Sequence, residues 1–489
     1  MNGLIISVLI YEFLVIGGIG FYLSREAKKG KDSFLLSGRD LPVFAVGVTL
    51  ALTVLGSAHI FGLMETAWHL GAVSMWFSFA HVILIAVVCL GTGRWVRRLN
   101  VSTVPELIEM LYGPKIRIIT ACIMAPTIFG LLTMETQAIG IAFASMTGWS
   151  IQKGAIIGGI IGVFYVVLAG MKEIAWINLI NTVVMYLGMI IAAIYLAKAL
   201  PGQNWDYVSE YYVNEGQPWM TNIFGTPDLM FTFSLGVILS VVFAQGISQM
   251  TLQTAMSAKS ERTVKKSLWI AAIVNGVFGV FAVCIGLAAK ALPEFHALGP
   301  KLAGATLIVE LLPNWVVVWL LASFLGALLS TFAMTAITPA TIFVKDLYVK
   351  IYEPEASDEK QTRLARIVII VLSILAIVVA MANPPIVSAI TWLFAWLIPV
   401  FWIVIIGLFW KRSTIAATVT LSVCWIVNLL WSFTSLPGVL GVRLENAHVI
   451  FILSIVLGFT LSAFTKGERG LFRKNRYEMD LEKRTSAMK

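Results

Sequence analysis

Residues 42–71 read PVFAVGVTLALTVLGSAHIFGLMETAWHLG, an apolar stretch long enough to cross a membrane and interrupted by GSAH at 56–59. Residues 229–256 read LMFTFSLGVILSVVFAQGISQMTLQTAM and carry QGISQ at the corresponding depth, at 245–249. A glycine among polar residues weakens a helix. We therefore expect two helices that break near the middle of the membrane. The alternative is that each glycine is only a close packing contact between helices.

The composition around these stretches is that of a membrane protein. Of the 489 residues, 59% are hydrophobic and 12% are charged, whereas a soluble domain carries about 25% charged residues. This deficit excludes an ordinary soluble enzyme and a nucleic-acid-binding chain, although the net charge is +9. We expect an all-α polytopic membrane protein, with a single transmembrane domain over 1–465 and a charged cytoplasmic tail over 466–489.

Thirteen apolar segments are predicted to form transmembrane helices, because lipid offers no hydrogen-bond partner to an unpaired backbone. They lie at 3–23, 42–71, 72–93, 116–147, 152–170, 176–199, 229–256, 267–290, 314–348, 365–382, 386–410, 414–433 and 447–465.

The basic residues predict how these helices are oriented. With the N-terminus outside, 30 of the 35 Lys and Arg residues fall in cytoplasmic segments and five fall outside. Such a bias is typical of membrane proteins, whose cytoplasmic loops are positively charged. We expect a multi-pass protein of the plasma membrane, specifically a bacterial inner membrane, with a cytoplasmic C-terminus. The expected partners are a small-molecule solute and the lipid bilayer, without nucleic acid or an obligate protein partner.

The thirteen segments divide into one, five, five and two. Repeats of five spans, over about 42–199 and 229–410, would have opposite orientations because five is an odd number. Inverted repeats with a binding site at the membrane midplane are typical of secondary transporters.

Three further segments carry a resemblance to a known family. They are LAGMKEIAWINLIN at 168–181, LQTAMSAKSERTVKKS at 252–267, and ALLSTFAMTAITPATIFVKDLY at 327–348. The chain resembles the sodium:solute symporters, which include bacterial proline, sialic acid and sugar carriers. Thr254 stands where that family usually has arginine. The resemblance implies a LeuT-type five-plus-five inverted repeat, with one additional N-terminal and two additional C-terminal helices.

The same resemblance implies sodium-coupled uptake of a small polar solute by alternating access, and a sodium site. Its ligands would be main-chain carbonyls and hydroxyls from the second and ninth spans, carried over to Leu52, Leu55, Ala327, Ser330 and Thr331. A hard cation needs several oxygen ligands, and an unwound backbone supplies carbonyls. The alternative is that both hydroxyls bond back to carbonyls of their own helix.

The sequence also departs from the family at residues 177–181. Asn178 replaces the family's aspartate, Ile177 its threonine and Asn181 its glutamine. In relatives that use a second sodium ion, the aspartate would be a ligand. A neutral amide removes that charge, so we expect one coupling ion.

Polar residues at mid-membrane depth define the expected solute site, because intramembrane polar groups mark transport pathways. The expected residues are Thr53, Ser57, His59, Glu135, Gln137, Gln245, Ser248 and Gln249, with Trp392 and Trp396 as an outer gate or a stacking surface. For the tryptophans, an interface belt or core packing is the alternative.

Glu135 leaves three interpretations open, because a buried carboxylate needs a cation or a proton. It can bind an amine-bearing solute such as an amino acid, carry a coupling proton, or pair with His59. The alternative function is therefore a proton-coupled symporter of a monocarboxylate that uses Glu135 and His59. A different class, an integral-membrane transferase, would need catalytic clusters in large loops, and the short loops here show no such motif. A channel or a transporter-like sensor has no supporting feature.

Overall fold

The computed structural model describes residues 2–14, 18, 39–168, 171–276, 278–439 and 444–473. These residues hold ten helices long and apolar enough to cross a membrane, and three shorter apolar helices at Gly3–Glu12, Val43–Val54 and Ile151–Val167. Every predicted segment overlaps at least one of them. The total of thirteen transmembrane helices stays a prediction, because length and composition alone do not place a helix in a membrane.

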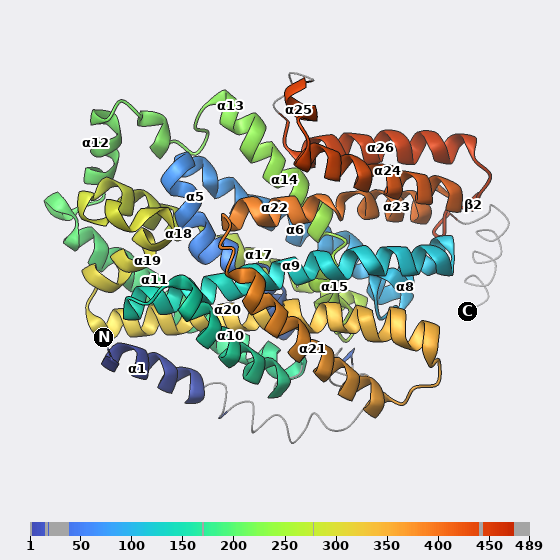
Figure 1. Cartoon of the computed structure of the whole chain (residues 1–489), viewed down its shortest axis with the longest axis horizontal. Coiled ribbons are helices and arrows are strands. Elements are labelled where there is room, and N and C mark those ends of the chain that lie inside the picture. The colour runs from blue at the N-terminus through green and yellow to red at the C-terminus, as the bar shows by residue number, and fades with distance from the viewer. Residues whose placement is uncertain are drawn as a thin grey trace, which may run out of the picture.

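The elements follow one another as helices joined by short loops (Figure 1). The first half contains α1 (Asn2–Glu12), α4 (Val43–Val54), η3 (Ala58–Gly62), α5 (Leu63–Leu70), η4 (Gly71–Met75), α6 (Trp76–Val87), η5 (Val88–Thr92), α7 (Gly93–Leu99), α8 (Val104–Tyr112), α9 (Pro114–Thr147), α10 (Ile151–Leu168), α11 (Met171–Ala199), η6 (Pro201–Gln203), α12 (Asp206–Asn214) and η7 (Pro218–Thr221).

The second half begins with the other interrupted span. It contains α13 (Pro227–Leu229), η8 (Met230–Leu235), α14 (Gly236–Ser240), η9 (Val241–Gln245), α15 (Gln249–Met256), α16 (Glu261–Lys266), α17 (Leu268–Gly276), α18 (Phe278–Ala291), η10 (Pro293–Leu298), α19 (Gly299–Leu311), α20 (Asn314–Ile342), η11 (Phe343–Tyr352), α21 (Asp358–Ala380), α22 (Ile386–Ala395), α23 (Ile398–Phe409), β1 (Lys411–Arg412), α24 (Thr414–Phe433), α25 (Leu436–Val439), α26 (Asn446–Phe464) and β2 (Glu468–Arg469), with β1 and β2 antiparallel.

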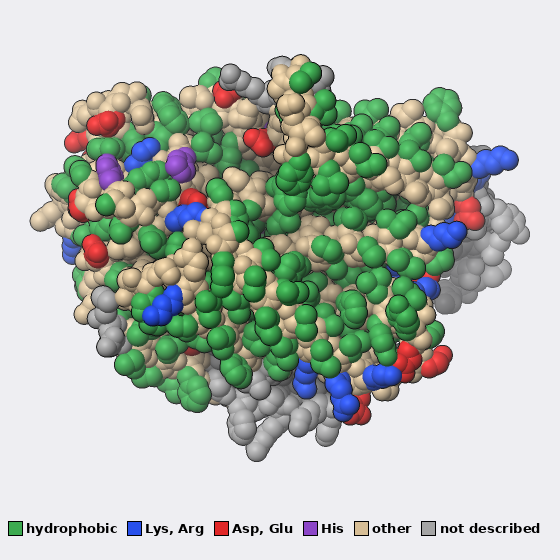
Figure 2. Space-filling view, in the orientation of Figure 1, with side chains coloured by type: hydrophobic (Ala, Val, Ile, Leu, Met, Phe, Trp, Pro, Cys, Tyr) green, Lys and Arg blue, Asp and Glu red, His purple; other side chains and the backbone are tan. Residues whose placement is uncertain are grey.

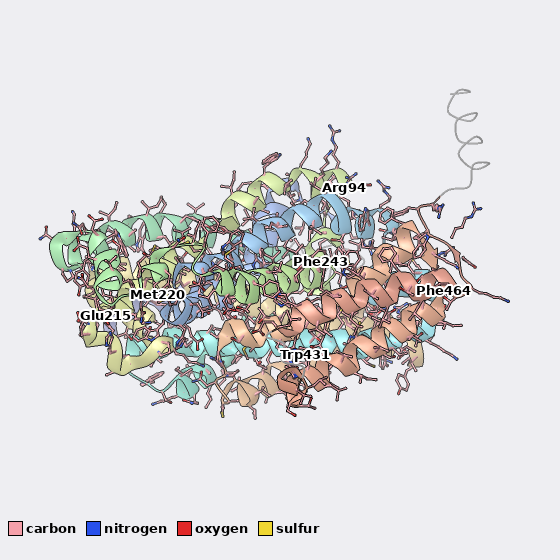
Figure 3. All side chains as sticks on the ribbon, turned by 90° about the horizontal axis from the view of Figure 1, so that it is seen from above. Arg94, Glu215, Met220, Phe243, Trp431 and Phe464 are labelled. Carbon is pink, nitrogen blue, oxygen red and sulfur yellow. The ribbon has the colours of Figure 1, made fainter. Side chains whose placement is uncertain are left out.

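The surface has the distribution of a membrane protein. Hydrophobic side chains cover the middle of the face in Figure 2, and charged side chains gather toward its ends. Large apolar side chains are exposed on several helices, including Trp269 (73%), Ile190 (61%) and Val378 (60%). Seen from above, Glu215 lies at one end of the long axis and Arg94 toward the other (Figure 3). Exposure of so many apolar side chains is unfavourable in water and favourable in the hydrocarbon interior of a membrane.

Both predicted helix breaks are present. The first helix ends at Val54 and resumes at Ala58, and the second ends at Gln245 and resumes at Gln249. The start of the first interrupted helix and the end of the second are joined by the parallel bridge between Leu41 and Ala258. Since the beginning of one meets the end of the other, the two helices run in opposite directions, as inverted repeats require.

The centre of the molecule is formed by α20, which packs against α9, α10, α11 and α4. In the long span that contains α20, 89% of the most apolar window is buried, compared with 28% for the span of α21. Helix α20, which carries Ser330 and Thr331, is therefore shielded from lipid and lies beside the first helix break. Of the predicted cytoplasmic tail, residues 474–489 lie outside the described part of the chain, as do the basic residues at 25–31.

Candidate solute and sodium site

The first helix break frees backbone groups in the interior. Leu55 has φ −99° and ψ 71°, which is outside the helical region, and its N–H donates to Leu52 O at 3.2 Å. Gly56 follows, and a Cβ added there would lie 2.5 Å from Glu135 Oε1. Glycine is therefore required at this position by the close approach of a carboxylate, which the sequence alone does not reveal.

Glu135 of α9 is held at this break by Ser57. The Ser57 N–H lies 3.1 and 3.0 Å from the two carboxylate oxygens, and the Ser57 hydroxyl donates to Oε1 at 2.7 Å. The carboxylate thus receives donors at the start of the second half-helix, where the helix dipole favours negative charge. His59 is not a recorded partner of Glu135; its ring packs against His81 and Phe77, with centroids 4.5 and 5.2 Å apart.

Three of the residues expected to bind sodium converge around one hydroxyl. Thr331 Oγ1 lies 3.0 Å from Leu52 O and 3.1 Å from Ala327 O. The hydroxyl has one proton and so donates either to Leu52 O of the broken helix or to Ala327 O of its own helix, and it lies between the two carbonyls. Ser330 Oγ is buried and has no partner among the described residues. Two carbonyls, a hydroxyl between them and an unsatisfied neighbouring hydroxyl are hard oxygen ligands, so this donor set fits a sodium ion.

A small central cavity adjoins these groups. Its volume is about 20 Å³, which is room for about one water molecule. It is lined by Thr53, Val54, Gly56, Ala58, Phe77, His81, Leu131, Glu135, Gln245, Met250, Thr331, Thr335, Ile390 and Phe394. Among the predicted solute ligands, Thr53, Glu135 and Gln245 thus share one cavity with Thr331, an expected sodium ligand. An organic solute needs the walls to move apart.

The orientation of Gln245 follows from its neighbour His81. His81 Nδ1 lies 2.7 Å from Phe77 O, which can only accept, so this nitrogen carries the proton. In the neutral ring, Nε2 is then an acceptor, and Gln245 Nε2 donates to it at 3.0 Å. The amide oxygen of Gln245 is buried without a partner among the described residues. The cavity is therefore lined by an unused acceptor as well as a carboxylate.

Three other predicted ligands lie elsewhere or have other partners. Gln249 binds the start of α8, since its Oε1 accepts from Val104 N at 2.7 Å. Gln137 Nε2 donates to Pro384 O at 3.0 Å in the loop before α22. Ser248 is buried at the second break, and its hydroxyl has no partner in the described part of the chain.

Trp392 lies on the face of α22 that points away from the central cavity, and Trp396 directly follows the last residue of that helix. The Trp392 indole donates to Ser432 Oγ at 2.8 Å, and its ring centroid is 6.0 Å from that of Trp396. Neither lines the central cavity, whereas Ile390 and Phe394 of the same helix do. The spacing of the two tryptophans in the sequence does not indicate which face of α22 points toward the cavity.

Asn178 is buried in α11, and neither atom of its amide has a partner among the described residues. Nearby, Asn181 accepts from the Tyr11 hydroxyl at 3.1 Å and packs so closely on Gly326 that a Cβ there would lie 2.3 Å from its amide nitrogen. The side chains of 168–176, which include most of the motif that begins at 168, lie outside what the structure describes.

A family model for the sodium:solute symporter family matches residues 34–420. The chain belongs to that family. The symporter is 22% identical over 444 residues to a sodium/glucose cotransporter of Vibrio parahaemolyticus, covering 83% of the chain and 80% of the relative. It is 23% identical over 480 residues to a sodium/pantothenate symporter of Haemophilus influenzae, covering 96% of each.

The fold agrees with that membership. A solved structure described as the substrate-bound outward-open state of a sodium-coupled sialic acid symporter superposes with a TM-score of 0.80 at 17% identity, covering 95% of the symporter and 99% of that chain. The predicted LeuT-type fold is confirmed. The symporter couples sodium to solute uptake across a membrane and is not an enzyme, and sodium is its coupling ion.

Sequence reasoning did not assign His81, Thr335, Phe77 or Phe394 to the site. The sequence could have indicated His81. An intramembrane histidine four residues after Phe77 can bond to the carbonyl of that residue, which leaves its other ring nitrogen free to face a binding site. The remaining three are ordinary residues of apolar helices, and only the packing shows which of them meet the cavity.

Proposed function

We propose that the symporter takes up a small amine-bearing solute together with one sodium ion. The observation that carries this proposal is the lining of the central cavity, which presents the Glu135 carboxylate and the unpaired amide oxygen of Gln245 but, among the residues that the structure describes, no Lys or Arg. An ammonium group supplies the positive charge that Glu135 lacks among the described residues, and a donor for the amide oxygen of Gln245. A solute carboxylate would find no cationic side chain among the described residues that line the cavity.

The broken helix supports the same solute class. In transporters of this architecture, the free N-terminus of a half-helix can receive an anionic group of the solute. Here the Ser57 N–H already binds Glu135. The carboxylate of Glu135 therefore occupies the position that a carboxylate of the solute would need. A solute would instead be bound through its own hydrogen-bond donors, and a monocarboxylate is disfavoured.

For the ion, we propose that Leu52, Leu55, Ala327, Ser330 and Thr331 provide the oxygen ligands. Thr331 lines the central cavity and also bonds Leu52 O. A sodium ion that replaced this hydrogen bond would fix the hydroxyl and the broken helix together, next to the solute. Sodium and solute binding would be coupled through this shared part of the structure. Each of them would order Thr331 and the broken helix, and the other would then bind to groups that are already in place.

For the membrane, we propose a bacterial inner membrane with the N-terminus outside and the C-terminus cytoplasmic. The bias of 30 basic residues to five supports this orientation. Under it, uptake proceeds from the side of residues 200–228, with sodium moving down its gradient.

The test is a thermal-shift screen of amines, amino acids, organic acids and sugars on the purified protein, in sodium chloride and in potassium chloride. An amine-bearing solute is expected to raise Tm only with sodium, because a ligand of the native state stabilises it. The same solute should then accumulate in proteoliposomes under an inward sodium gradient. Stabilisation by a monocarboxylate or sugar alone would contradict the proposal.

Glu135→Gln is the matched variant. It should abolish sodium-dependent amine accumulation, since the amide has the shape but not the charge. Glu12→Gln serves as control, because Glu12 is also a buried carboxylate without a described partner but does not line the cavity. If uptake by Glu135→Gln persists but no longer responds to pH, the proton-coupled alternative gains support and the amine proposal fails.

A further inference from the structure

One short helix at the side predicted to be cytoplasmic carries a row of exposed basic side chains. Arg262, Lys265 and Lys266 of α16 are exposed, and their spacing of three and four residues places them on one face of the helix. None of the three has a hydrogen bond or ion pair recorded within the described part of the chain. The acidic residue of α16 does not neutralise them, because Glu261 binds Arg94, which is labelled in Figure 3, at 2.5 Å.

The same face continues from α16 into the apolar helix α17. Ser267 joins the two helices with φ −69° and ψ −15°, and its carbonyl accepts from the Ala271 N–H at 3.0 Å, so the helical register is kept. Trp269 and Ile273 therefore follow the basic row on one face, and both are largely exposed. At a rise of about 1.5 Å per residue, Trp269 lies about 5 Å further along the axis than the two lysines.

This order of side chains matches the layers of a phospholipid. The basic groups come first, an indole follows at the depth typical of the membrane interface, and an aliphatic side chain lies beyond it. Basic residues at the cytoplasmic surface attract acidic headgroups. A soluble anion would contact only the basic groups and would leave the indole without a role. The row and the indole together therefore favour a lipid.

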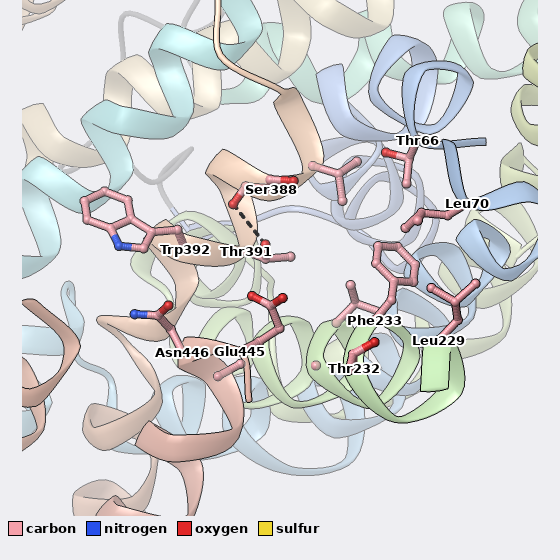
Figure 4. Close-up of a pocket in the computed structure, with 14 residues that line it drawn as sticks. Thr66, Leu70, Leu229, Thr232, Phe233, Ser388, Thr391, Trp392, Glu445 and Asn446 are labelled. Atoms are coloured by element: carbon pink, nitrogen blue, oxygen red, sulfur yellow. Dashed lines mark hydrogen bonds between the residues drawn. The ribbon is translucent and has the colours of Figure 1, made fainter. Parts of the chain in front are cut away.

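The side predicted to be external differs in charge. A hollow of about 270 Å³ there contains the Glu445 carboxylate, and no Lys or Arg is among the described residues that line it (Figure 4). Two basic residues predicted to lie outside already have protein acceptors. Lys290 Nζ donates to Trp68 O at 2.8 Å. Lys301 Nζ donates to Pro384 O at the same distance, 2.8 Å. The charge of the α16 row is instead complementary to acidic lipids, which give the cytoplasmic leaflet its negative surface potential.

Helix α16 is also bonded to both interrupted helices. Lys259, between α15 and α16, donates its backbone N–H to Leu41 O at 3.0 Å, just before α4. At the other end of α16, Ser267 Oγ donates to Val43 O, in the first residue of α4, at 2.9 Å. A ligand held by α16 therefore acts on the beginning of the first interrupted helix and on the end of the second.

The geometry points to a lipid site on this face. We propose that Arg262, Lys265, Lys266 and Trp269 bind one acidic phospholipid of the cytoplasmic leaflet, which fixes α16 against the two interrupted helices. The phosphate lies among the three basic side chains, and the glycerol and the upper acyl chain lie along the indole. The site is separate from the central cavity, so this inference uses the proposed orientation of the chain and does not depend on the solute.

The first test measures binding to the purified protein in detergent at low salt. The probe is dioctanoyl phosphatidylglycerol, and dioctanoyl phosphatidylcholine is the neutral comparison. The acidic lipid should raise Tm more than the neutral one, because a ligand of the native state stabilises it. Arg262→Gln with Lys265→Gln and Lys266→Gln should weaken the affinity for the acidic lipid about 100-fold, since each basic side chain near an acidic surface contributes about a factor of five.

A matched variant separates the site from net charge. Lys115→Gln with Arg363→Gln and Lys466→Gln removes three exposed basic residues of the same side and should bind the acidic lipid as the unmodified protein does. An equal loss in both triple variants would overturn the site, as would equal stabilisation of the unmodified protein by the two lipids. Stabilisation of the same size by inorganic phosphate would mean that the row binds a soluble anion, and would overturn the lipid assignment.

Trp269 provides a second readout at a single side chain. Brominated acyl chains quench tryptophan fluorescence on contact, so in vesicles brominated phosphatidylglycerol should quench more than brominated phosphatidylcholine at the same mole fraction. This excess should disappear in Trp269→Phe and in the triple variant of α16. Trp315→Phe, which removes an exposed indole at the opposite end of the bundle, should retain it. An undiminished excess in Trp269→Phe would show that no acidic lipid lies along this indole, and would overturn the site.

Discussion

Gly56 and Glu135 show how one missing side chain permits a charged site. The carboxylate of Glu135 reaches the backbone of Ser57 only because position 56 has no Cβ. Glu135 would otherwise have to leave the N-terminus of the half-helix, and its charge would be buried without donors. The glycine in the quoted stretch thus serves electrostatics as well as flexibility.

Gly56→Ala is expected to displace the Glu135 carboxylate, because the new Cβ would lie 2.5 Å from Oε1. Overpacking of this kind costs about 1–3 kcal/mol of stability. We expect a lower Tm and strongly reduced sodium-dependent uptake. Gly188→Ala is the control, since its Cβ would meet Leu320 at an ordinary 3.5 Å. Equal behaviour of the two variants would contradict the proposed contact.

Ser330 and Thr331 make the proposed sodium site testable residue by residue. Ser330→Ala with Thr331→Ala should remove the stimulation of uptake by sodium while the protein still folds, since alanine is a good helix former. The measurement is initial uptake rate against sodium concentration, with Tm recorded in sodium and potassium. Ser323→Ala is the matched control, because that hydroxyl bonds Leu320 O of its own helix. Unchanged sodium dependence in the double variant would refute the assignment.

At the scale of elements, a charged cluster joins α8, α9 and η11 at the side predicted to be cytoplasmic. Glu109 of α8 binds Arg117 at 2.5 Å and Lys350 at 2.6 Å, and Arg117 also binds Asp346 at 2.7 Å. Asp346 accepts from Thr103 Oγ1 at 2.7 Å as well. These contacts hold α8, α9 and η11 together at the side predicted to be cytoplasmic.

The stability that this cluster contributes depends on pH, because the pKa of Glu109 is lowered by folding. Partial burial raises that pKa, but the bonds to Lys350 and Arg117 lower it more, so it lies below the ordinary 4.5. A carboxyl whose pKa is lowered by folding stabilises the protein above about pH 4.5, and this stabilisation is lost as the pH falls through the folded-state pKa.

Glu109→Gln should therefore lower the free energy of unfolding by about 1 kcal/mol near neutral pH, the size expected for a partly exposed ion pair. The difference from the unmodified protein should shrink below pH 4.5. Thermal unfolding in detergent from pH 7 to pH 4 would measure both. Glu310→Gln, on an exposed face of α19, provides a control; a deficit that is constant with pH would contradict the ionic origin.

At the scale of the whole molecule, we propose that the packing around Asn178 limits the number of coupling ions. The inverted repeat places α11 beside α20 and α4, so Asn178 faces the interior where the family's aspartate would stand. A neutral amide provides an oxygen but no charge to offset the desolvation of a second cation. The three helices are far apart in the sequence, so only their packing brings Asn178 close to α4 and α20.

We expect one sodium ion per solute. The measurement is the reversal potential of solute flux in proteoliposomes at several sodium gradients, and a ratio of two would contradict the prediction. In the same assay, Asn178→Asp tests whether the added charge recruits a second ion. A ratio of one in both proteins would show that residue 178 alone does not set the stoichiometry.

The sequence by itself determined the class of fold. The apolar runs, the basic bias and the two polar interruptions predicted an all-helical transporter with broken helices, and both breaks occur where the glycines indicated. The sequence also selected Thr53, Glu135 and Gln245, which meet at one cavity with Thr331, a residue assigned through the family resemblance. Such features are local, because helix length, charge and helix interruption depend on neighbouring residues.

Only the tertiary structure decided which side chains face one another. It directs Gln249 to α8, turns Trp392 to the outer face of α22, and gives Glu135 the donors of Ser57 in place of His59. In a helix that is apolar on all sides, periodicity does not mark the inner face. Its rotation is set by close packing against helices that are distant in the sequence.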